Sequence, residues 1–233
     1  MSAVQTLRDF ISEDPRLEVI LNRYQYDPKF GMEFHQSFDD RDIAFMELLV
    51  RHFDTPETLD LEQVKTFPLE VLFSYLKNTH TYYLEKRLFE IDMSIERVKQ
   101  IYGNKYPVFY SVKLFWVKFI ADLQHHIQEE EDMLFPLAES LFKDVHSDQS
   151  DTSLKASRLT QLNEILEEHE DDDLEKGIGK FISFVKNNYP ELKGLLSFKV
   201  LILQLETFQH DLEIHRRVEE EAFIPMLVEI LNA

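Results

Sequence analysis

The chain has 233 residues, 44% of them hydrophobic, and its 44 acidic against 25 basic residues give a formal net charge of −19. This charge repels phosphate backbones and anionic lipid surfaces, which argues against nucleic acid and membrane partners. Five glycines, no cysteine and no sustained two-residue alternation favour an all-α fold without disulfides. Because there is no apolar run of about eighteen residues and no signal peptide, we expect a cytoplasmic protein.

The first 60 residues predict a small helical module made of short segments. Turn signals at Asp14-Pro15, at residues 27–31 and at residues 54–56 separate its apolar stretches. The expected helices are Val4–Ile11, Leu17–Tyr24 and Asp42–Phe53. We interpret residues 1–60 as one domain and residues 68–231 as a second, larger domain.

Four long amphipathic segments make up the second domain. Apolar residues recur at helical spacing, which predicts helices over residues 68–102, 107–145, 154–188 and 191–231. Turn signals around Gly103 and Pro190 close two helical hairpins, and the polar run 146–153 joins them as the loop expected to be least ordered. Pro136 predicts a kink, and the acidic run 167–173 marks a potential break. The sequence therefore predicts an all-α fold built on a four-helix up-down-up-down bundle.

Two segments of this bundle repeat one pattern: a histidine, a glutamate four residues on and a proline ten residues on. They begin at His126 and His215, 89 residues apart, and the same offset relates His80 to His169. Residues four apart share one face of a helix, so each His-x-x-x-Glu directs an imidazole and a carboxylate at one point. In a helical hairpin, two residues that are equally far from the turn lie at the same height. His80 and His126 are both 23 residues from Gly103, which lies at the turn. Six side chains should therefore converge on one metal site: His80, His126, Glu130, His169, His215 and Glu219.

Residues beside these six offer weaker alternatives. The pair His125 and Glu129 has the same spacing, but His125 stands eleven residues before Pro136, whereas His215 stands ten before Pro225. We therefore expect His125 to be exposed or to lie behind the ligands. Solvated charges or salt bridges are the expected roles of the adjacent glutamates, namely Glu129, Glu131, Glu220 and Glu221.

The donor types indicate which metal would bind. Imidazole and carboxylate donors in a chain without cysteine fit iron or manganese, with zinc or copper as adventitious occupants. Six ligands suit two metal ions bridged by both carboxylates, with open positions for water or a diatomic ligand. Asp172 and Asp173 lie three and four residues after His169 and could add a carboxylate, although an exposed acidic turn is the simpler interpretation. Ferritin-like bundles use Glu-x-x-His, which this chain lacks.

At these residues the chain resembles the hemerythrin-like superfamily, and within it the di-iron proteins for repair of iron centres. The shared features are the order His, His-x-x-x-Glu, His, His-x-x-x-Glu and the Leu-Phe-Pro of residues 134–136. The resemblance covers residues 68–231 and extends to Leu21–Gly31, where that family usually carries a Cys-Cys pair that this chain lacks. The family often places its first histidine at the position of Thr81, while the 46-residue spacing to His126 favours His80. The resemblance implies two non-haem iron ions with an oxo or hydroxo bridge, held by the six residues.

The resemblance also implies a function, the repair or protection of iron–sulfur clusters under nitrosative or oxidative stress, with iron–sulfur proteins as clients. The alternative is a module that binds or senses oxygen or nitric oxide without turnover, and a scaffold that has lost its metals is a third hypothesis. No residue stands out as an acid, a base or a nucleophile, so the sequence leaves open whether the protein is an enzyme. The oligomeric state is open as well, with a homodimer among the options.

Overall fold

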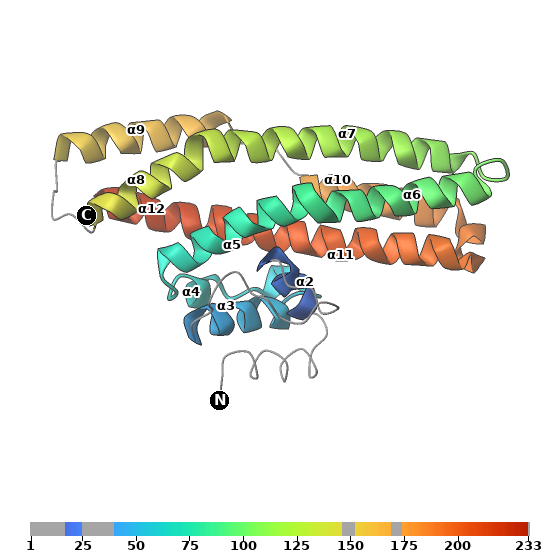
Figure 1. Cartoon of the computed structure of the whole chain (residues 1–233), viewed down its shortest axis with the longest axis horizontal. Coiled ribbons are helices and arrows are strands. Elements are labelled where there is room, and N and C mark those ends of the chain that lie inside the picture. Colours follow the sequence, from blue (N-terminus) through green and yellow to red (C-terminus); the bar gives the residue numbers. More distant parts are fainter. Residues whose placement is uncertain (1–16, 25–39, 146–151, 169–173, 233) are drawn as a thin grey trace. The chain divides into compact units, whose positions relative to one another are not determined.

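The computed structural model describes residues 17–24, 40–145, 152–168 and 174–232 (Figure 1). The regular elements in these ranges are all helical, which confirms the predicted all-α class, and no strand occurs among them. The chain divides into two compact units: Met1–Phe89 with His210–Phe223, and Glu90–Gln209 with Ile224–Ala233. The domain boundary predicted between residues 60 and 68 stays a prediction. None of the helices in the described ranges combines the length and apolar character that a membrane span requires.

The first unit contains the short helices of the N-terminal part and one longer helix. Its elements are α2 (Leu17–Leu21), η1 (Asn22–Tyr24), α3 (Asp40–Arg51), η2 (Pro56–Thr58), α4 (Leu61–Val64), α5 (Leu69–Tyr82), η3 (Tyr83–Arg87) and η6 (Glu219–Phe223). Helices are thus confirmed within Leu17–Tyr24 and Asp42–Phe53, whereas the helix predicted at Val4–Ile11 lies outside the described residues. Asp60 begins α4 by accepting a hydrogen bond from the Gln63 backbone at 3.1 Å.

Helix α3 packs against α5 in this unit, and aromatic side chains make the contact. The Phe45 ring on α3 lies 5.2 Å from the ring of Phe67 and 5.5 Å from that of Tyr75, both in edge-to-face geometry. On the other side of α5, Phe73 stacks on Phe223 of η6 at 6.0 Å. Phe45, Tyr75 and Phe223 are fully buried, so α5 is the central helix of the unit.

The second unit contains most of the remaining helices. They are α6 (Leu88–Tyr102), α7 (Val108–Glu129), η4 (Glu130–Leu134), α8 (Phe135–Val145), α9 (Thr152–Glu168), α10 (Leu174–Asn188), η5 (Pro190–Gly194), α11 (Leu196–Val218) and α12 (Ile224–Asn232). The first two residues of α6 belong to the first unit, because the second unit begins at Glu90. Helix α11 contributes to both units, because the stretch from His210 onward belongs to the first. The fourth predicted helix begins later than expected, since a 3-10 turn that starts at Pro190 precedes α11. The loop predicted at 146–153 and the break predicted at 167–173 lie largely outside the described residues.

Aromatic residues on α7 organise the core of the second unit. Phe115 stacks face to face on Phe181 of α10, with ring centres 4.0 Å apart. Phe119 meets Phe208 of α11 edge to face at 6.1 Å, and the buried Trp116 ring contacts both. Phe119 and Phe208 each stand seven residues before a histidine of the sequence repeat, so repeat-related residues meet in this core.

Three of the predicted long helices contain a π-helical segment in place of a regular turn. These are η3, η4 and η6, each five residues long. In η4 the Phe135 backbone N–H bonds the carbonyl of Glu130, five residues back, and the following residue, Pro136, has no N–H to offer. The chain changes direction between α7 and α8 at this point (Figure 1). The kink predicted from Pro136 is therefore present, and a π turn accompanies it.

Candidate metal centre

Two of the predicted ligands face each other inside the first unit. The Nε2 atoms of His80, on α5, and His215, on α11, lie 3.3 Å apart, and the ring centres are separated by 5.1 Å. His80 is fully buried and His215 is 5% exposed. Two buried imidazoles at this distance either share a proton in a long hydrogen bond or offer their lone pairs to one cation.

A buried carboxylate contacts one of these two histidines. Glu219 lies four residues after His215, and its Oε2 stands 3.3 Å from the His215 Nε2. Only 4% of Glu219 is exposed, and a carboxylate withdrawn from water in this way needs a proton, a cation or a metal. His80, His215 and Glu219 are thus all buried, and His215 contacts each of the other two.

The donor set and its spacing fit a metal ion. With metal–nitrogen bonds of about 2.0–2.1 Å, two nitrogens on one tetrahedral or octahedral ion lie roughly 2.8–3.4 Å apart. The separation of the two Nε2 atoms, 3.3 Å, falls within this range. Two histidines and one carboxylate are typical of non-haem Fe(II) sites with open coordination positions, and zinc uses the same donors.

The other His-x-x-x-Glu pair lies in the second unit. His126 Nε2 and Glu130 Oε1 are 2.7 Å apart, and Glu130 is 2% exposed. The alternative pair forms too, with His125 3.4 Å from Glu129, but the His125 side chain is 75% exposed. The position relative to Pro136 therefore distinguished the less exposed of the two histidines, since the His126 side chain is 18% exposed, and the expectation that His125 is exposed is confirmed.

The π segments coincide with the candidate ligands. η4 begins at Glu130 and η6 begins at Glu219, so the 89-residue repeat extends to the backbone hydrogen bonding. η3 begins at Tyr83, three residues after His80. π turns are energetically poorer than α turns and occur frequently at functional sites, where the extra residue redirects side chains. Their recurrence at both glutamates indicates that the positions of these carboxylates are specified by the fold.

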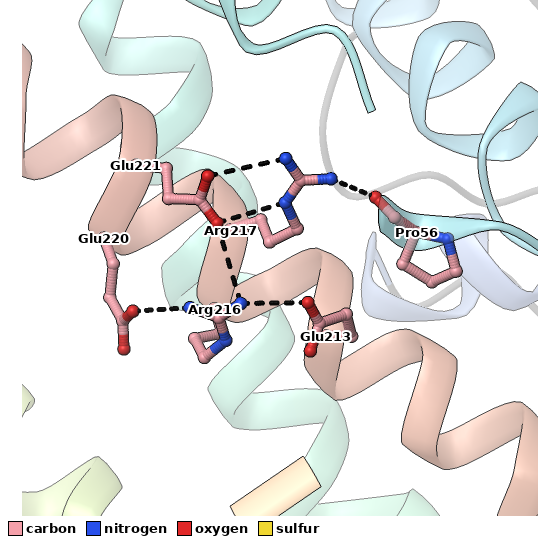
Figure 2. A network of polar contacts seen from close by, with 6 residues as sticks. All are labelled: Pro56, Glu213, Arg216, Arg217, Glu220 and Glu221. Carbon is pink, nitrogen blue, oxygen red and sulfur yellow. Dashed lines mark hydrogen bonds and ion pairs between the residues drawn. The ribbon is translucent and has the colours of Figure 1, made fainter. Parts of the chain in front are cut away.

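Two arginines that follow His215 bind the glutamates of η6 that are not candidate ligands (Figure 2). Arg216 donates to Glu220 at 2.7 Å and to Glu213 at 2.9 Å. Arg217 donates to Glu221 at 3.1 Å and to the Pro56 carbonyl, which joins η2 to α11. These contacts confirm that Glu220 and Glu221 form salt bridges, as expected from the sequence. The two arginines neutralise the outward carboxylates of η6 and leave Glu219 directed inward.

Buried tyrosines surround the His80–His215 pair. The Tyr83 ring lies 5.9 Å from that of His215, edge to face, and the Tyr75 ring lies 6.4 Å away. Burial raises the pKa of the Tyr75 hydroxyl to about 12, although the nearby Arg23 guanidinium opposes the shift. Burial also raises the pKa of Tyr83 well above its ordinary value. Both hydroxyls stay neutral at physiological pH and can donate a proton in a hydrogen bond.

The sequence reasoning did not identify the buried charged residues Arg23, Asp211 and Glu175. Asp211 lies four residues before His215, a spacing that could have placed it on the ligand face of the helix. Arg23 and Glu175 carry no comparable signal in the sequence. The remaining predicted ligand, His169, lies outside the described residues, as do its two alternative partners, Asp172 and Asp173.

Comparisons of the chain with models of protein families, with curated proteins and with solved structures each found no match. The case for a metal centre therefore depends on the sequence repeat and on the geometry of the buried histidines and glutamates.

Proposed function

We propose that the chain is a non-haem di-iron protein of the hemerythrin-like kind, which repairs or protects iron–sulfur clusters under stress in the cytoplasm. The buried group of His80, His215 and Glu219 carries this proposal, because its donor types and its 3.3 Å nitrogen spacing suit iron. The proposed cellular role comes from the resemblance of the ligand order in this chain to that of the proteins for repair of iron centres.

The proposal includes the topology of the bundle. The four arms would be α5 with α6, α7 with α8, α9 with α10, and α11 with α12, running alternately up and down. The packing of α7 on α10 and of α9 on α12 within the second unit is compatible with this arrangement. In such a bundle the repeat would bring His126, Glu130 and His169 level with the other three ligands, which would give two metal ions six protein donors.

The chain's own residues would have distinct roles at such a centre. The two glutamates would hold the ions together, and the four imidazoles would fix their outer sides. The apolar and aromatic residues around His215 would exclude water, while the neutral Tyr75 and Tyr83 hydroxyls could hold a proton near the site. A bound iron pair supplies redox-linked binding of a diatomic ligand and the capacity to release iron to a client.

A second function is favoured by one observation, the absence of cysteine. The chain has no thiol through which it could deliver iron, whereas reversible binding of oxygen or nitric oxide requires no thiol. A binding or sensing module without turnover is therefore the alternative. Full reversibility of the oxygen adduct, with no transfer of iron to a cluster-free client protein, would favour it.

The experiment that tests the proposal is the metal content of the protein. Protein from iron-supplemented cells is assayed by elemental analysis, and its optical spectrum is recorded in air. The expected result is two irons per chain with charge-transfer bands in the near ultraviolet. Less than half an equivalent of any metal after anaerobic reconstitution would overturn the di-iron proposal.

A matched pair of variants distinguishes the effect of removing a proposed ligand from the effect of removing an exposed histidine. His126→Ala removes the histidine that contacts the buried Glu130, and His125→Ala removes its exposed neighbour with the same spacing to a glutamate. We expect His126→Ala to lose iron and His125→Ala to retain the wild-type content. Equal content in both variants would exclude His126 as a ligand.

A further inference from the structure

The candidate metal group has a buried arginine beside it that comes from the N-terminal part of the first unit. Arg23 lies on η1, its side chain is 0% exposed, and it forms an ion pair with Asp211 of α11. Burial alone would lower the pKa of the guanidinium, but the negative charge of Asp211 raises it, so the group stays charged. A buried charge of this kind is costly unless it is paired and hydrogen-bonded.

Each of the three guanidinium nitrogens donates a hydrogen bond to a different partner. Its Nε donates to the Thr79 hydroxyl oxygen at 2.8 Å, its Nη1 donates to the Val19 carbonyl at 2.9 Å, and its Nη2 donates to Asp211. The Thr79 hydroxyl in turn donates to the Tyr75 carbonyl at 2.8 Å, so its oxygen is left to accept from Arg23. The guanidinium also lies 5.3 Å from the centre of the Tyr75 ring.

Two of these partners are neighbours of the candidate ligands. Thr79 directly precedes His80 on α5, and Asp211 lies one helical turn before His215 on the same face of α11. The planar, rigid guanidinium of Arg23 therefore joins α5 to α11 within one helical turn of the two facing imidazoles. A slide or rotation of α5 against α11 would have to break at least one of its bonds.

We propose that Arg23 is a positioning residue of the metal centre, which holds His80 and His215 at a spacing that one metal ion accepts. This inference rests on the proposed function, because it assigns Arg23 to the retention of the metal. It makes the N-terminal segment part of the site. Residues that orient metal ligands from behind typically change metal affinity by about 10- to 100-fold when they are replaced.

The test measures how fast cobalt(II), a spectroscopic probe for the iron site, leaves the full-length protein for an excess of chelator. Arg23→Lys keeps the positive charge but cannot hold Thr79 and Asp211 together, and we expect release about 10- to 100-fold faster than from wild type, with shifted cobalt d–d bands. Arg51→Lys is the matched control, because the Arg51 side chain is 64% exposed and pairs with Glu47 at 3.5 Å on the surface. It should release cobalt at the wild-type rate.

A second variant covers the case in which Arg23→Lys does not fold. Thr79→Val removes one acceptor while Arg23 keeps its ion pair with Asp211, and it should accelerate release by several-fold and shift the d–d bands in the same direction. Urea unfolding of each metal-free variant separates a general loss of stability from an effect at the ligands. Release within twofold of wild type and unchanged bands, in a folded Arg23→Lys or Thr79→Val variant, would overturn the positioning role. A wild-type protein that retains no cobalt or iron would overturn both this role and the proposed function.

Discussion

The Nε2 atoms of His80 and His215 lie 3.3 Å apart, although 135 residues separate them in the chain. Both imidazoles are buried, and Glu219 approaches the same nitrogen of His215. Without a cation, one of the two facing nitrogens must carry a proton to avoid repulsion between lone pairs. A metal ion removes this conflict, which is why the pair is the strongest structural argument for a metal centre.

The two histidines should act as one unit in metal binding. We expect His80→Ala and His215→Ala each to weaken cobalt(II) binding by at least about 100-fold, and the double variant to lose little more than either single one. Optical titration of the metal-free protein measures the affinities. His210→Ala, on the same helix with its ring against Phe53, is the control and should bind normally. Additive losses in the double variant would show that the histidines serve different ions.

Glu219 and Glu220 are adjacent but should respond in opposite ways to the same substitution. Glu219→Gln should lose the metal, while the metal-free protein should unfold at no lower urea concentration than wild type, because a buried charge has been removed. Glu220→Gln breaks only the exposed contact with Arg216, so its metal affinity should stay within about twofold of wild type. Metal content and urea midpoints of both variants check this. A normal metal content in Glu219→Gln would remove this carboxylate from the centre.

The stability of the metal-free protein should fall at high pH because of Tyr75. Its pKa is raised from 10.0 to about 12 in the folded state, so the unfolded chain loses the hydroxyl proton first. The stabilisation is complete below pH 10 and is lost between pH 10 and pH 12, with a total of roughly 3 kcal/mol. Urea unfolding at a series of pH values measures the slope. Tyr75→Phe should have a shallower decline across this window, and an identical decline would mean that other groups cause it.

The aromatic contact between repeat-related residues should dominate the stability of the second unit. Phe208 is fully buried against Trp116 and Phe119, and Phe208→Ala should cost about 3–5 kcal/mol in the free energy of unfolding. Leu203→Ala on the same helix is the control, since Leu203 is 64% exposed and its loss should cost less than about 0.5 kcal/mol. Similar costs for the two variants would contradict the described packing.

Two glycines should differ in their tolerance of a methyl group. Gly177 lies inside α10 with open space where a Cβ would stand, so Gly177→Ala should stabilise the protein by about 0.5–1 kcal/mol. At Gly103, in the turn after α6, a Cβ would meet the Lys99 carbonyl oxygen at 2.4 Å, so Gly103→Ala should destabilise it. Thermal unfolding of the two variants measures both signs. Destabilisation by Gly177→Ala would show that the chain near this glycine packs differently.

Local patterns in the sequence were sufficient to predict the all-helical class and the main helices. Their spacing to Pro136 and Pro225 distinguished Glu130 and Glu219 from the neighbouring glutamates. These two are buried, whereas Glu131 and Glu220 are exposed. This succeeds because helical periodicity is a local property, in which residues four apart share a face whatever the rest of the chain does. The identity of these residues as metal ligands stays a prediction.

Tertiary structure alone decided which distant residues meet. The ion pair of Arg23 with Asp211 joins positions 188 residues apart. Its contribution to the free energy of folding depends on the burial of both side chains, which no spacing in the sequence reveals. The helical spacing of the sequence likewise does not predict the π turns at Glu130 and Glu219, because such turns depend on packing across helices. The sequence by itself therefore determined the helices and the candidate ligands. The packing of α5 against η1 and η6 decided that Arg23 lies beside the helices that carry the two histidines. Only the tertiary structure could decide this, because a buried charge is stable only where several elements supply its partners.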